Sequence, residues 1–131
     1  MNDHFSKVKE YLTELEYQIV EENEEDGLIV VESEGNGITN LVLGLADPLL
    51  IVEQFIVELK NPQPAIYQQL LQKSRDIIHG AFVLDESGSK LIFRNTHELE
   101  NLDLNELEAT LNSLALLLGE YSSEIIKLSK N

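Results

Sequence analysis

Apolar residues change from a helical to a strand-like spacing within the first 45 positions. Between residues 3 and 16 they recur every three or four positions, which predicts an amphipathic helix that Asp3 can cap. The apolar positions of this helix are Phe5, Val8, Leu12 and Leu15. Three strands are predicted next, at residues 17–22, 28–33 and 38–45. Their β-branched residues favour an extended backbone, and turns that contain glycine separate them.

The segment at residues 49–59 has features of both a helix and a strand. Asp47 and Pro48 resemble a helix start, whereas the β-branched residues and the period-two alternation favour a strand, which we predict. One face carries Leu49, Ile51, Phe55, Val57 and Leu59, interrupted by Glu53, and the other carries Leu50, Val52 and Ile56. Because a sheet that is apolar on both sides must cover both, we expect helices on one face and a second subunit or a client on the other.

The second half of the chain predicts a helix, a β-hairpin and a long final helix. Residues 65–76 place apolar side chains on one side, and residues 80–84 and 90–94 flank a polar turn. The last helix begins at Asp103, which can cap it while Glu106 reaches back, and its apolar stripe runs to Leu128. Such a stripe also occurs in coiled coils, but apolar residues at 115–117 widen it, which favours packing against the sheet.

These elements predict an α+β fold in which helices pack on a twisted antiparallel sheet. Their order is α-β-β-β-β-α-β-β-α. The chain has 131 residues, which fits a single domain spanning residues 1–131, and no repeat or linker divides it.

Charge and composition limit the classes of function. The net charge of −15 repels phosphate backbones and anionic membranes, so we expect no nucleic-acid partner. No apolar run approaches 18 residues, so we expect no membrane insertion. The first residues lack the pattern of a signal peptide and the chain has no cysteine, which favours the cytoplasm. The acidity either serves solubility alone, or keeps soluble a protein that also exposes apolar binding surface, or attracts basic partners.

No motif assembles convincing chemistry. The acidic segment at residues 21–27 has the carboxylate density of a calcium loop, but Ser33 stands where a bidentate Glu is required. Ser6 and Lys9 fit S-x-x-K without its companion motifs, and the glycines at 35 and 37 lack the third of a dinucleotide fingerprint. The histidines, His4, His79 and His97, have no metal-ligand spacing. We therefore predict no enzyme, and no catalytic, cofactor-binding or metal-binding residue.

Three sequence blocks, together with the element order, resemble the Tir-chaperone (CesT-like) family of type III secretion chaperones and its YbjN-like relatives. The blocks lie at residues 47–54, 79–85 and 99–109. The resemblance implies a homodimer that holds the N-terminal segment of a client protein in extended form, through apolar grooves and strand edges. The alternative that it implies is a YbjN-like regulatory or stress-associated protein with the same fold and no secretion client.

We expect the dimer or partner contact to involve the apolar residues of the predicted second helix and one face of the 49–59 strand. These residues are Leu50, Val52, Ile56, Tyr67, Leu70 and Leu71.

Overall fold

The computed structural model describes residues 3–130, with side chains through Leu128, so both ends of the predicted domain lie outside the described residues. The elements follow the predicted order, with one further helix at the carboxyl end. They are α1 (Asp3–Glu14), β1 (Gln18–Asn23), β2 (Leu28–Ser33), the short 3-10 helix η1 (Glu34–Asn36), β3 (Ile38–Ala46), β4 (Leu49–Glu58), α2 (Pro64–Ser74), β5 (Ala81–Leu84), β6 (Lys90–Glu98), α3 (Leu104–Glu120) and α4 (Ser122–Lys130).

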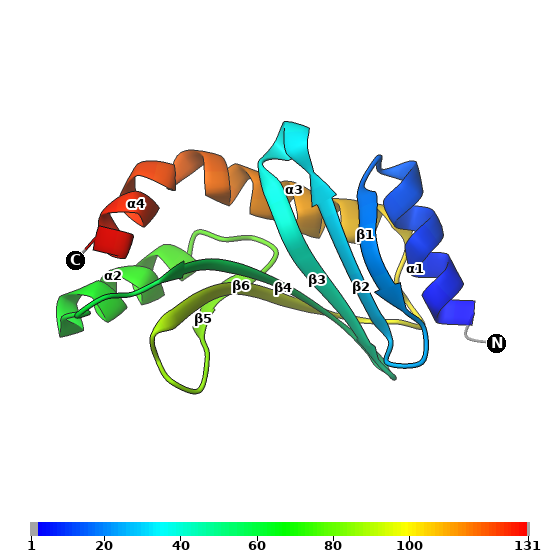
Figure 1. The fold of residues 1–131 in the computed structure, drawn as a ribbon, viewed down its shortest axis with the longest axis horizontal. Coiled ribbons are helices and arrows are strands. Elements are labelled where there is room, and N and C mark those ends of the chain that lie inside the picture. Colours follow the sequence, from blue (N-terminus) through cyan, green and yellow to red (C-terminus); the bar gives the residue numbers. More distant parts are fainter. Residues whose placement is uncertain (1–2, 131) are drawn as a thin grey trace.

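The strands form one six-stranded sheet in the order β1-β2-β3-β4-β6-β5, and every neighbouring pair is antiparallel. Figure 1 shows the sheet strongly twisted, so that β1–β3 run at a steep angle to β4 and β6. Helices α3 and α4 run along one side of the sheet, with α1 at one end and α2 at the other (Figure 1).

The helices and one face of the sheet build a single hydrophobic core. The stripe predicted for α1 is buried, because Phe5, Val8 and Leu12 are at most 1% exposed. Helix α3 contributes Leu107, Leu111, Leu114 and Leu117 in the same way. The sheet supplies Ile29, Val31, Leu41, Leu43, Leu50, Val52, Leu91 and Phe93. The α+β fold class is therefore confirmed.

Segment 49–59 is a strand, as predicted. Leu49 of β4 pairs with Ala46 of β3, so Asp47 and Pro48 form the turn of a hairpin and not a helix start. At the carboxyl end, Asp103 caps α3 by accepting a hydrogen bond from the Glu106 N–H at 2.8 Å. The stripe to Leu128 was predicted to be one helix, but it is divided at Tyr121 into α3 and α4.

Strands β3 and β4 separate beyond the pair Val42–Glu53. Asn40 has a positive φ of 53°, which turns β3 away, and the Gln54 side chain lies in the space that results. Its Nε2 donates to the carbonyls of Thr39 and Phe55, both at 2.9 Å, so the amide replaces ladder hydrogen bonds at the split. Gln54 is 6% exposed, and its Oε1 has no hydrogen-bond partner among the described residues.

Gly80 is a position where only glycine fits. Its φ is +124°, and an added Cβ would overlap the ring of Phe93, which is fully buried. We expect Gly80→Ala to lower the free energy of unfolding by about 2 kcal/mol, because strain and overpacking add. Urea denaturation measures the change. Gly88→Ala is the matched control, because it also has a positive φ but no atom within 4 Å of the added Cβ. Equal losses in the two variants would contradict the packing argument.

Candidate protein-binding surfaces

The residues considered for chemistry do not come together in the structure. Within residues 3–130 no group of three or more acidic, histidine or cysteine side chains could hold a metal ion. In the acidic turn, Asn23 and Asp26 hydrogen-bond each other at 3.0 and 3.1 Å. Lys9 of the S-x-x-K pattern pairs with Glu22 at 2.7 Å and lies 5.9 Å from the centre of the Phe5 ring. No helix in the described part of the chain is long and apolar enough to cross a membrane.

A polar cluster inside the described part of the molecule joins β6 to α3. Thr110 is fully buried, and its Oγ1 lies 2.8 Å from both Asn95 Nδ2, which donates to it, and His97 Nε2. Burial lowers the pKa of His97, an effect that the carboxylate of Glu106 opposes and His79 reinforces. Neutral His97 can accept the Thr110 hydroxyl proton, so the cluster satisfies its own polar groups. We therefore interpret it as a structural contact.

The face of β4 that was expected to contact a partner is the face that packs against the core. Leu50 and Val52 are fully buried beneath the helices, and Ile56 packs against the same core, so none of them presents a surface to a partner. Leu49 and Phe55 on the opposite face are 38% and 51% exposed. No helix covers this opposite face, which we call the open face.

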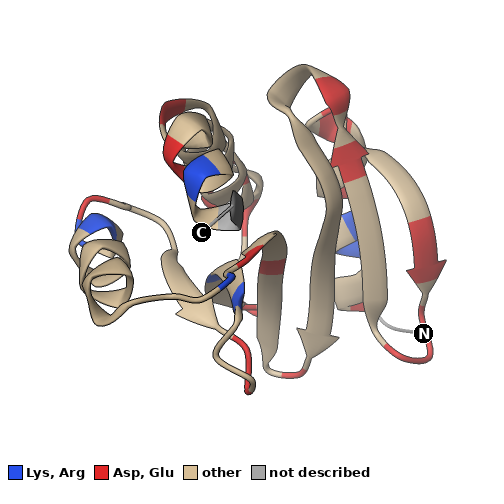
Figure 2. Ribbon diagram, turned by 60° about the vertical axis from the view of Figure 1, so that its left-hand side comes forward, with Lys and Arg blue, Asp and Glu red and all other residues tan. Residues whose placement is uncertain are grey.

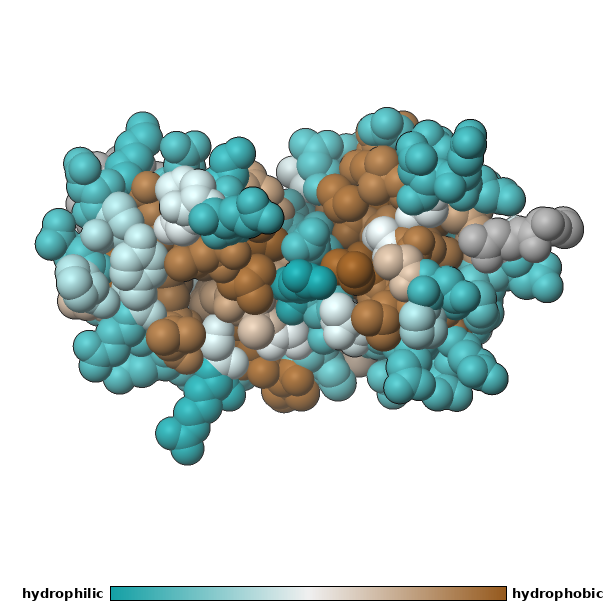
Figure 3. Space-filling model, turned by 90° about the horizontal axis from the view of Figure 1, so that it is seen from below, coloured by the Kyte–Doolittle hydropathy of each residue, from teal (hydrophilic) through white to brown (hydrophobic). Residues whose placement is uncertain are grey.

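The strand register shows which residues share the open face with Leu49 and Phe55. Apolar side chains on it come from every strand from β2 across to β5 at the edge, namely Leu28, Val30, Val42, Ile51, Val83 and Ile92. Each of these six is partly exposed, and none packs against the buried core. Figure 3, seen from below Figure 1, shows apolar side chains gathered in two areas with hydrophilic side chains between and around them.

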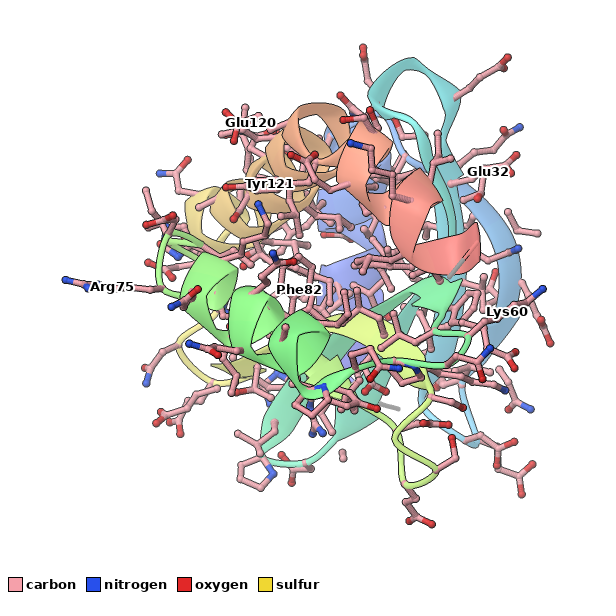
Figure 4. The ribbon with its side chains drawn as sticks, turned by 90° about the vertical axis from the view of Figure 1, so that its left-hand side faces the viewer. Glu32, Lys60, Arg75, Phe82, Glu120 and Tyr121 are labelled. Carbon is pink, nitrogen blue, oxygen red and sulfur yellow. The ribbon has the colours of Figure 1, made fainter. Side chains whose placement is uncertain are left out.

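A second apolar surface lies between α2 and the β5–β6 hairpin. Leu70, which was expected to contact a partner, points into the core and is 6% exposed, whereas its neighbour Leu71 is 72% exposed. Tyr67 is partly buried and donates its hydroxyl proton to the Gly88 carbonyl at 3.2 Å. With Leu84 they border an apolar groove of about 280 Å³. Figure 4 shows Phe82 directed inward behind α2, while Arg75 points away from it.

A third apolar groove, of about 260 Å³, lies between α3 and the segment before β5. Ile78 and Leu116 on its rim are 84% and 61% exposed. No signal in the sequence was taken to predict this groove. Leu116 was assigned to a widened core stripe, and no periodic pattern marks Ile78.

The negative charge is unevenly distributed along the chain. Residues 10–59, which include β1–β4, contain 13 Asp or Glu and no Lys or Arg. Figure 2 shows acidic positions on these strands and their turns, and basic positions on helices and on the second half of the molecule. Lys73 of α2 lies 4.3 Å from the centre of the Tyr121 ring, at the junction of α3 and α4. The sheet thus has an acidic end and a mixed end.

Among the described residues, a twisted antiparallel sheet carries helices on one face and apolar side chains on the other, and no catalytic cluster is assembled. The family model described as CesT_Tir_1 matches residues 1–131. The chain therefore belongs to this family, as the resemblance in the sequence predicted. A comparison with the sequences of curated proteins finds no match.

Solved structures share the fold at low sequence identity. The type III secretion chaperone SycH of Yersinia pestis, in complex with a fragment of YscM2, is 19% identical with a TM-score of 0.62, covering 96% of this chain and 99% of that one. The chaperone-effector complex of HopA1 and SchA is 12% identical with a TM-score of 0.62, covering 96% and 92%. YbjN of E. coli, described as a putative transcription regulator, is 12% identical with a TM-score of 0.62, covering 92% of each chain. These similarities show a common fold.

The buried His97 cluster predicts a loss of stability in acid. Because folding lowers the pKa of His97, its neutral form contributes stability that is fully present above the usual value of 6.5 and is lost as the pH falls below it. We expect His97→Gln to flatten the pH dependence of the free energy of unfolding between about pH 7.5 and 5. Urea titrations across this range measure it. An unaltered slope in His97→Gln would contradict the assignment.

Proposed function

We propose that this protein is a non-enzymatic protein-binding module, a homodimeric secretion-chaperone-like protein that holds a polypeptide client in extended form. One observation carries the proposal, namely the apolar face of the sheet that the chain's own helices leave uncovered. Exposed apolar surface of this extent on a soluble domain is typical of a site for other chains. The membership of the CesT_Tir_1 family supports the same conclusion.

The relatives favour a polypeptide partner over a small ligand. Two of the similar structures are complexes of a chaperone with another protein or a fragment of one. The two grooves beside α2 and α3 have a mainly apolar lining, and the His97 cluster uses its polar groups internally. A small-ligand site orients its ligand with converging polar groups, so these mainly apolar grooves suit an apolar polypeptide segment better.

The alternative is a regulatory or stress-associated protein with the same fold and no client. The similarity to YbjN, a putative transcription regulator, motivates it. Direct contact with DNA is disfavoured by the net charge of −15, so such a role would act through proteins. Hydrophobic-dye binding distinguishes the two, because a protein that buries its open face in self-association should bind little dye.

The first experiment compares one polypeptide in two states. Ribonuclease A that has been reduced and blocked with iodoacetamide is a basic, extended chain, and native ribonuclease A has a similar charge in a folded form. We expect the protein to bind the unfolded form with at least about tenfold higher affinity, because only that form offers apolar side chains to the open face. Isothermal titration calorimetry measures both. Equal affinities, or no binding to the unfolded form, would refute client holding.

The second experiment concerns the dimer. Of the residues expected at a subunit contact, Leu71 and Tyr67 remain accessible on α2, and we propose the α2 surface as the interface. We expect wild-type protein to have the mass of a dimer in light scattering and Leu71→Asp to have the mass of a monomer, because a carboxylate would be desolvated there. Leu116→Asp, at a similarly exposed leucine on α3, should stay dimeric. A dimeric Leu71→Asp would exclude this interface.

A further inference from the structure

We propose that the open face selects polypeptide segments that are both apolar and basic, and that it places their Lys or Arg residues over β1 and β2. The inference rests on the proposed function and names the chemistry of the partner. It follows from where the apolar and the charged side chains lie on this face.

The apolar positions form a band across the sheet. Val30 and Val42 are cross-strand partners, and Leu28 and Ile51 both lie opposite Gly44, so these four form one cluster. Phe55, Ile92 and Val83 are consecutive cross-strand partners and form the second. Along β4, Glu53 separates Ile51 of the first cluster from Phe55 of the second, and it lies opposite Val42 on one side and Arg94 on the other. From β2 to β5 the band crosses four inter-strand spacings, about 19 Å, which an extended segment of about six residues spans.

The charges on the open face differ between its two ends. At the β4–β6 end two of the acids have a basic cross-strand partner, since Glu53 lies opposite Arg94 and Glu58 opposite Lys90, whereas Glu98 lies opposite Leu49. At the β1–β2 end, Glu21 lies opposite Val30 and Glu32 opposite Gln18, so neither has such a partner. No Lys or Arg occurs anywhere between residues 10 and 59. The unbalanced charge beside the first apolar cluster is therefore negative.

This distribution favours a basic segment over the other occupants. A second copy of the chain would offer these carboxylates no unbalanced positive charge, because a two-fold interface brings together only residues of this same face and its Arg94 and Lys90 already lie opposite acids. The unbalanced carboxylates also repel an anionic membrane or a nucleic acid. A segment with Lys or Arg beside its apolar residues meets opposite charge at β1–β2. Burial of the apolar residues supplies affinity, while the charges supply selectivity and faster association.

The test uses two labelled peptides of about 20 residues with the same apolar residues at alternate positions, which places them on one side of an extended chain. One carries Lys at the polar positions and the other carries Glu. We expect the Lys peptide to bind at least about tenfold more tightly in fluorescence anisotropy at low salt. The difference should shrink at about 0.5 M salt, where the screening length is only a few ångströms. Equal affinities at low salt would overturn the inference, while binding of unfolded ribonuclease A would leave the proposed function intact.

Two pairs of variants test the location. Phe55→Asp should weaken binding of the Lys peptide at least about tenfold, since the second cluster loses its most exposed member, whereas Leu116→Asp on the helix side should not. Because Phe55 is already 51% exposed, folding should survive, and circular dichroism checks it. A loss of binding in Leu116→Asp alone, or conversion of the dimer to a monomer by Phe55→Asp, would overturn the assignment of this face.

Two double variants distinguish the effect of the carboxylates on β1 and β2 from the effect of the net charge of the whole molecule. Glu21→Lys with Glu32→Lys should remove most of the preference for the Lys peptide. Glu86→Lys with Glu108→Lys changes the net charge by the same amount at exposed positions, in the β5–β6 turn and on α3, and should preserve the preference. If both double variants lose the preference equally, the net charge alone selects the peptide, and the placement of basic residues over β1 and β2 is wrong.

Discussion

A six-stranded sheet has two faces, and this chain has helices for one of them. Every other property of the molecule depends on that asymmetry. Helices α1, α2 and α3 bury their apolar stripes against one face, and the buried side chains there form a single cluster. The opposite face keeps partly exposed valine, leucine, isoleucine and phenylalanine side chains. Since removing apolar area from water is favourable at about 25 cal/mol per Å², this face retains free energy for association.

The split between β3 and β4 makes one-sided coverage possible. Beyond Val42 and Glu53 the strands diverge, which lets β1–β3 wrap around α3 while β4 continues beside β6. A divergence of this kind leaves backbone carbonyls without partners inside the protein, which is destabilising. The Gln54 amide satisfies two of them, although its own Oε1 then lacks a partner among the described residues. One buried polar side chain therefore stabilises the curvature on which the core depends.

Much of the fold could be predicted because helices and strands have different apolar periods. The stripe of α1, the cap at Asp103 and the alternation in β4 are local signals that the structure confirms. The direction in which β4 faces could not be settled by alternation, because both of its faces are apolar. The informative residue was Glu53, since a carboxylate is rarely buried without a partner and therefore marks the outer face. The sequence could not show that Leu71 is exposed while its neighbour Leu70 is buried, because this depends on how α2 packs against the rest of the protein.

The acidity and the open face are related features of one surface. An apolar face of this size would favour aggregation in a protein without charge, and the carboxylates around it provide repulsion between copies. Acidic residues at any exposed positions, for example on α3, would provide the same repulsion between copies. Instead the basic residues are absent from β1–β4, while Arg94 and Lys90 stand opposite acids on the other half. Solubility does not require such a division, whereas recognition of a segment in one orientation does, because it needs two distinguishable ends.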